Sequence, residues 1–104
     1  MDKVVRNGMV AVAISPGFGA GWTTWNTLSP FEPKIIEMIE SGNKHKITEE
    51  WLKEQGIIEK DQYCCTLGSE DLEVEWLPEG TAFKINEYDG SESIQTAEDL
   101  NYVA

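Results

Sequence analysis

The six residues Met9–Ile14 constrain the fold more than any other part of the chain, because they form an apolar run without a charge. Valine alternates with alanine in this run, which stops at Ser15-Pro16-Gly17. A strand of this kind is buried on both faces, so it must be central in a sheet that is covered on both sides. Asn7-Gly8 precedes it and is typical of a two-residue type I′ turn, which predicts a hairpin with residues 3–6.

Two helices and further strands are predicted downstream of this hairpin. A capping-box pattern at 29–32 precedes a helix that begins at Pro30 or, if Pro33 delays it, a few residues later, and that ends at Gly42. Its core-facing residues are predicted to be Phe31, Ile35, Met38 and Ile39. Thr48 caps a second, shorter helix over 49–55. Alternation with period two predicts strands at 72–76 and 81–88, and a short run at 93–96 follows.

These elements predict a single α+β domain over residues 1–104. We expect a mostly antiparallel sheet with the two helices packed on one face. The acidic residues at about 97–104 are predicted to be a loosely held tail.

The charge of the chain excludes several classes of function. Nineteen acidic side chains against eight basic ones give 104 residues a net charge of −11. Residues 53–104 carry three basic and thirteen acidic side chains, so most of this charge lies in the second half. Duplex nucleic acids and anionic membranes attract basic proteins, so we predict neither as a partner. No apolar run is long enough to span a bilayer and no secretory signal is visible, which predicts a cytoplasmic protein.

Residues for catalysis or metal binding are scarce. Cys64 and Cys65 are adjacent, a spacing that strains a disulfide, and they are predicted to be free, partly buried thiols. No Cys/His set with zinc spacing is present, and the only imidazole, His45, lies in a polar stretch at 41–46 between the predicted helices, so no nucleophile with a histidine base is indicated. A carboxylate pair is the remaining route to catalysis, but nineteen acids single out no pair. We therefore predict no catalytic residue, no metal, no cofactor and no enzymatic activity.

The most informative segment is the glycine-rich stretch at 15–27, between the buried strand and the first helix. It matches neither the P-loop nor the GxGxxG dinucleotide pattern. Its flat aromatic rings, hydroxyls and amide suit a nucleotide or nucleoside pocket, in which a base stacks on a ring. The alternative is a tight bend whose tryptophans fill the core. The candidate ligand-binding residues of this stretch are Ser15, Gly17, Phe18, Gly19, Ala20, Gly21, Trp22, Thr23, Trp25 and Asn26.

A second candidate segment lies at 86–93 and holds three carboxylates within six residues. Such groups could hold a divalent cation, although the calcium-loop pattern does not fit, or could bind ribose hydroxyls and a base amino group; a solvated acidic turn is the alternative. The candidate residues here are Glu87, Tyr88, Asp89, Ser91 and Glu92. We expect the two segments to meet around a polar cleft with an aromatic wall, within one chain or across a subunit boundary.

Three stretches resemble a family of small bacteriophage-encoded proteins that carry an SPGxGAGWxxWN-like segment. They are SPGFGAGWTTWN at 15–26, WLPEGTAFKI at 76–85 and EYDGSESI at 87–94, together about a third of the chain. Residues 43–71 take no part in the resemblance. It implies a counter-defence protein in the host cytoplasm, a homo-oligomer that sequesters a nucleotide immune signal between its subunits. The alternative is an acidic decoy that binds and inhibits a basic host protein.

Overall fold

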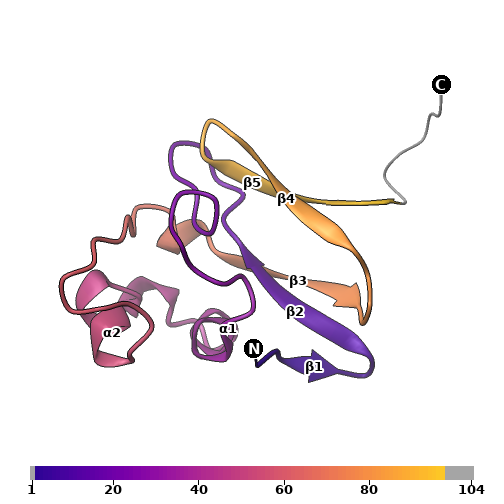
Figure 1. Cartoon of the computed structure of the whole chain (residues 1–104), viewed down its shortest axis with the longest axis horizontal. Coiled ribbons are helices and arrows are strands. Elements are labelled where there is room, and N and C mark those ends of the chain that lie inside the picture. The colour runs from indigo at the N-terminus through magenta and orange to yellow at the C-terminus, as the bar shows by residue number, and fades with distance from the viewer. Residues whose placement is uncertain (1, 98–104) are drawn as a thin grey trace.

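A computed structural model describes residues 2–97 and confirms the α+β class (Figure 1). The predicted tail lies outside the described residues from position 98 onward. The elements are β1 (Val5–Arg6), β2 (Met9–Ile14), α1 (Pro33–Glu40), α2 (Glu49–Glu54), β3 (Glu73–Pro78), β4 (Phe83–Tyr88) and β5 (Ser91–Thr96), with short 3-10 turns at Lys44–Lys46 and Ser69–Asp71. No helix within residues 2–97 is long and apolar enough to cross a membrane.

The central position of β2 is confirmed. It pairs antiparallel with β1 on one side and with β3 on the other, in a register that runs from Met9 opposite Pro78 to Ile14 opposite Glu73. Asn7 and Gly8 both have positive φ, 52° and 76°, as the type I′ turn requires. Residues 10–14 are all buried.

The strands form two sheets, whereas the sequence predicted one. β1, β2 and β3 make the first sheet, and β4 and β5 make a separate hairpin. A turn after Pro78, closed by the Thr81 N–H donating to the Pro78 carbonyl at 3.0 Å, sends β4 back across the first sheet. β4 does not extend that sheet but lies over one face of it, where Phe83 lines a cavity of about 180 Å³ together with Val10 and Val12 of β2. β5 is also longer than predicted and begins at Ser91.

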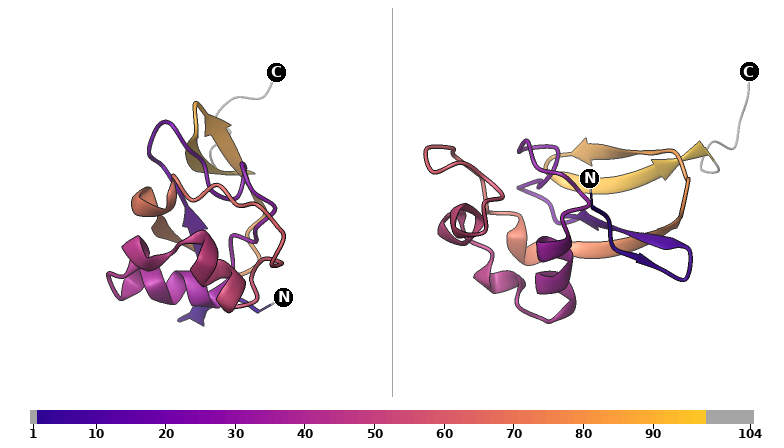
Figure 2. Two further views of the ribbon diagram at one scale, coloured as in Figure 1. Left: turned by 90° about the vertical axis from the view of Figure 1, so that its left-hand side faces the viewer. Right: turned by 60° about the horizontal axis from the view of Figure 1, so that its bottom comes forward.

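The residues of β2 alternate between two layers. Ala11 and Ala13 face the helices and belong to the main core, as predicted for helices on one face, and their small side chains let α1 lie close to the sheet. Val10 and Val12 face the β4–β5 hairpin on the other side. Figure 2 shows the hairpin and the helices on opposite sides of the first sheet. The core cluster on the helical side is Ala11, Ala13, Trp22, Leu28, Ile35, Ile36, Ile47, Leu52, Ile58, Cys64 and Leu72.

The predicted cap of α2 is confirmed, but α1 is capped by Glu32 and not by Ser29, the first residue of the capping-box pattern. α1 begins at Pro33, the later of the two predicted starts, and its cap is Glu32, whose side chain accepts from the Lys34 N–H at 3.3 Å. Phe31 therefore precedes the helix and packs edge-on against Phe83 of β4, with 6.0 Å between the ring centroids. Thr48 caps α2 by accepting from the Trp51 N–H at 3.1 Å.

Candidate functional site

The structure brings the two candidate segments together within one chain. The Gly19 N–H donates to the Asp89 carbonyl at 2.7 Å, and the Ser91 hydroxyl donates to the Pro16 carbonyl at 2.6 Å. A side chain at Gly90 would collide with the backbone of Ala20, so the β4–β5 turn lies directly against the glycine-rich loop. The prediction that the two segments lie close together is thus confirmed.

Glu92 joins the two segments from the inside. Its side chain is 1% exposed, and its Oε1 accepts from the Ser15 N–H at 2.9 Å. Its Oε2 accepts from the Thr24 N–H at 2.8 Å and from the Thr24 hydroxyl at 2.7 Å. The Glu92 N–H in turn donates to the Ser15 carbonyl at 2.9 Å. Glu92 therefore has a structural role that holds the loop on β5, and it is not open to a ligand.

A third segment, residues 62–71, completes this end of the molecule. The Asn26 side-chain amide pairs with both backbone groups of Cys65, accepting from its N–H at 2.9 Å and donating to its carbonyl at 3.0 Å. The Ser15 hydroxyl donates to the Gly68 carbonyl at 2.9 Å. We call residues 15–27, 62–71 and 87–91 together the loop end, which lies at the left of Figure 1.

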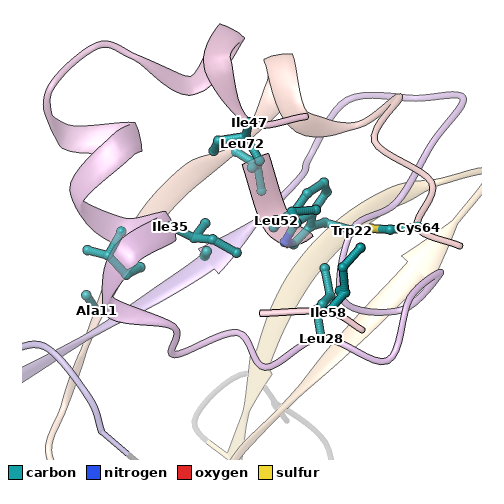
Figure 3. Packing of buried hydrophobic residues seen from close by; sticks show 11 residues of the cluster. Ala11, Trp22, Leu28, Ile35, Ile47, Leu52, Ile58, Cys64 and Leu72 are labelled. Carbon is teal, nitrogen blue, oxygen red and sulfur yellow. The ribbon is translucent and has the colours of Figure 1, made fainter. Parts of the chain in front are cut away.

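Several predicted ligand residues are buried, which corrects their assignment. Trp22 is 0% exposed and lies in the core near Cys64 and Leu52 (Figure 3), so it is not a stacking surface. Its Nε1 has no hydrogen-bond partner within residues 2–97. Ser15, Ala20 and Gly21 are buried as well. At these positions the structure agrees with the alternative prediction, a tight bend with a tryptophan in the core.

Other predicted residues are open to solvent. Phe18 is 72% exposed, Trp25 is 45% exposed and Tyr88 is 78% exposed. Gly19, Glu87 and Asp89 are exposed too, while Gly17, Thr23, Asn26 and Ser91 are half-buried. The available surface is thus made of rings and acidic groups rather than of the loop's hydroxyls and backbone amides.

Sequence reasoning missed three residues of this end. Tyr63 and Leu67 are about as exposed as Tyr88. They lie in a segment without helical or strand periodicity, so the sequence pattern did not indicate their exposure. Thr24 was passed over in favour of Thr23, yet Thr24 binds Glu92. Five of the six large hydrophobic residues exposed within residues 2–97 belong to the loop end, and only Val5 lies elsewhere.

The predicted polar cleft beside residues 17–21 does not coincide with any of three cavities found within residues 2–97. Those cavities measure about 500, 400 and 180 Å³ and lie around β3, β4 and β5. None of them is lined by a residue of the loop end. The loop end is instead marked by an exposed surface that carries five large hydrophobic side chains.

The charge of the loop end is entirely negative. Glu70, Asp71, Glu87 and Asp89 are exposed, and its three segments contain no lysine or arginine. Asp71 lies against Gly17, where a side chain would collide with the Asp71 carboxyl group. Acidic groups and exposed rings are therefore found on the same three segments.

Neither thiol chemistry nor a metal cluster marks another site. Both cysteines are free, as predicted, and burial together with the adjacent Cys65 raises the pKa of Cys64 to about 11. Cys64 is therefore a protonated, unreactive thiol near neutral pH. No group of three or more His, Cys, Asp or Glu side chains within residues 2–97 is arranged to hold a metal ion.

Comparisons with protein-family models, with curated proteins and with solved structures find no match to this chain.

Proposed function

We propose that this protein is an acidic binding protein whose loop end docks a basic partner protein. The observation that carries the proposal is the concentration of exposed large hydrophobic side chains at the loop end, away from the three cavities around β3, β4 and β5. A small ligand needs a concave site that covers most of its surface, whereas a protein partner needs an exposed patch. The resemblance to phage proteins makes a cytoplasmic host protein the candidate partner.

The loop end has the composition of a protein interface. Aromatic side chains dominate the binding energy of such interfaces, because they bury a large area for little loss of rotamer freedom. Phe18 and Tyr88 are the most exposed rings on the two segments that Glu92 ties together. The backbone beneath them is therefore fixed before binding, which reduces the ordering cost.

The acidic groups between the rings select the partner's charge. Opposite charge at the rim of an interface speeds association and disfavours acidic competitors. Because exposed charges are screened by salt, the complex should weaken as the ionic strength rises.

The test is capture of a partner from a bacterial lysate at low salt, followed by affinity measurement with the purified partner. We expect Phe18→Ala with Tyr88→Ala to weaken the complex by roughly 30-fold or more, since truncated interface anchors cost about 2 kcal/mol or more in total. Both side chains are exposed, so the variant should keep the wild-type free energy of unfolding within about 0.5 kcal/mol.

The matched control is Val5→Ala, which removes the one large exposed hydrophobic side chain that lies outside the loop end. It should bind like the wild type. Equal binding by the double variant, or a partner without a basic surface, would contradict the proposal.

A second candidate function is sequestration of a nucleotide between two copies of the chain. It is favoured by the flat rings of Phe18, Trp25 and Tyr88, which are exposed beside the glycine-rich loop. Because these rings are exposed and the three cavities lie elsewhere, a second copy would close a pocket over the base.

The nucleotide hypothesis is tested with a panel of signalling nucleotides, measured by thermal shift and native mass spectrometry. A bound nucleotide should raise the melting temperature and leave a dimer that releases it chemically unchanged. Trp25→Ala should weaken binding about 5- to 150-fold if its ring is the stacking surface. A monomer that no nucleotide stabilises would rule this candidate out and leave the protein-binding proposal standing.

A further inference from the structure

Within residues 2–97, the outer edge of β3 has no neighbouring strand. β3 is the last strand of its sheet, and β4 forms its own hairpin instead of pairing with it. Long unpaired edges are uncommon in native proteins, which usually interrupt them with a bulge, a lysine or a covering segment. β3 pairs with β2 over all six of its residues, and its edge is marked by the negative charges of Glu73 and Glu75 and by Pro78 at its end, which disfavour an acidic or identical strand.

The hydrogen bonds of β2 show which groups of β3 are free. The Ala11 N–H donates to the Val4 carbonyl at 2.9 Å and the Ala13 N–H to the Pro30 carbonyl at 2.8 Å, so both point away from β3. Antiparallel pairs alternate, so Val74 and Trp76, which lie opposite Ala13 and Ala11, direct their backbone groups away from β2. Within residues 2–97, neither bonds to the backbone of another segment.

A groove runs beside this edge. The cavity of about 500 Å³ lies between β3 and the β4–β5 hairpin, and it is lined by Glu75 and Leu77 on one side and by Ile94 and Thr96 on the other. The hairpin lies across from β3 in the right-hand view of Figure 2. Alternate side chains of a strand added to β3 would enter this groove, because side chains alternate between the faces of a sheet.

The charges along β3 indicate what kind of strand could add to its edge. Glu73 and Glu75 are exposed on the face of β3 that looks toward the hairpin, and Glu79 follows directly after the strand. None of the three forms an ion pair within residues 2–97. A second copy of β3 would bring glutamates of both chains together, which disfavours self-pairing.

We infer that an extended basic segment of the partner protein adds to β3 as a further strand. Its backbone pairs with Val74 and Trp76, its apolar side chains enter the groove beside Leu77, and its lysines or arginines meet Glu73 and Glu75. The inference rests on the proposed function for the partner's basic charge, but it uses a different surface from the loop end.

The probe is a capped peptide of alternating lysine and valine, added to the full-length protein. We expect binding by calorimetry and slower amide hydrogen exchange at Val74 and Trp76 by NMR. A control peptide, N-methylated at two adjacent central residues, keeps the charge but cannot pair along either edge. It should bind roughly tenfold more weakly and leave the exchange unchanged.

Substitutions test the charges separately. Glu73→Gln with Glu75→Gln should weaken peptide binding roughly fivefold or more at low salt. The matched control is Glu54→Gln on α2, which removes an exposed acid far along the chain from β3 and should have no effect. Phe18→Ala with Tyr88→Ala should bind the peptide like the wild type, so a failure here is distinct from a failure at the loop end.

Three results would overturn strand addition. The first is equal binding by the N-methylated peptide, which would leave only a charge effect. The second is unchanged exchange at Val74 and Trp76 in the presence of bound peptide. The third is slow exchange at both amides before any peptide is added, whether in a monomer or in a self-associated form, because the edge would then be covered already.

Discussion

Replacing Glu92 with alanine is expected to lower the free energy of unfolding by about 2–4 kcal/mol. The carboxyl group accepts three hydrogen bonds, two from backbone N–H groups and one from a hydroxyl. Leaving a buried donor without an acceptor costs about 1–3 kcal/mol. The Ser15 N–H is fully buried and bears this cost, whereas water reaches the half-exposed Thr24 groups and reduces it. Urea or thermal unfolding measures the difference.

A milder variant and a control make this result specific. Glu92→Gln keeps one carbonyl oxygen but turns an amide N–H₂ toward a donor, so we expect an effect between wild type and alanine. Glu70→Ala removes an exposed glutamate of the loop end and should change the free energy of unfolding by less than about 0.5 kcal/mol. A Glu92→Ala protein as stable as Glu70→Ala would show that the carboxyl group does not hold the loop.

Substituting Gly90 with alanine is expected to cost about 2–4 kcal/mol, for two separate reasons. Its φ of +84° lies in the left-handed region, where a Cβ costs about 1 kcal/mol. The added Cβ would also press on the backbone N and Cα of Ala20, and crowding in a packed site costs about 1–3 kcal/mol more. The free energy of unfolding measures the sum.

Gly80 separates the two causes. Its φ is +88°, almost the same, but an added Cβ would meet nothing within 4 Å. Gly80→Ala should therefore show only the conformational cost of about 1 kcal/mol. Equal destabilisation by the two substitutions would mean that the turn does not press on the glycine-rich loop.

The sequence determined the local elements well because their signals are local. Asn7-Gly8 specifies the first turn by its preference for positive φ, and Thr48 specifies the start of α2 by its side-chain oxygen. The charge-free run at β2 correctly required cover on both faces. The second face is covered by the β4–β5 hairpin, which forms a sheet of its own. Which distant segment packs on that face is not encoded in any short sequence pattern.

The candidate site was only partly predictable. Its two segments do meet. Glu92, however, was predicted to belong to a solvated or ligand-binding acidic turn, whereas it lies on the same side of β5 as Ile94 and Thr96. That spacing was an available signal for an inward-facing position. The burial of Trp22 and the exposure of Trp25 had no such signal, because an irregular loop has no period that assigns faces to its residues.

The bond between Ser15 and Glu92 spans 77 positions of the chain, and this fixes when the loop can close. A ribosome releases residues 15–26 well before it adds Glu92, so during synthesis the donors of the loop bond to water. Contacts this distant in sequence must also wait for a large loss of chain entropy. We therefore expect the glycine-rich loop to become ordered among the last steps of folding, and a chain truncated before β5 to leave the loop open.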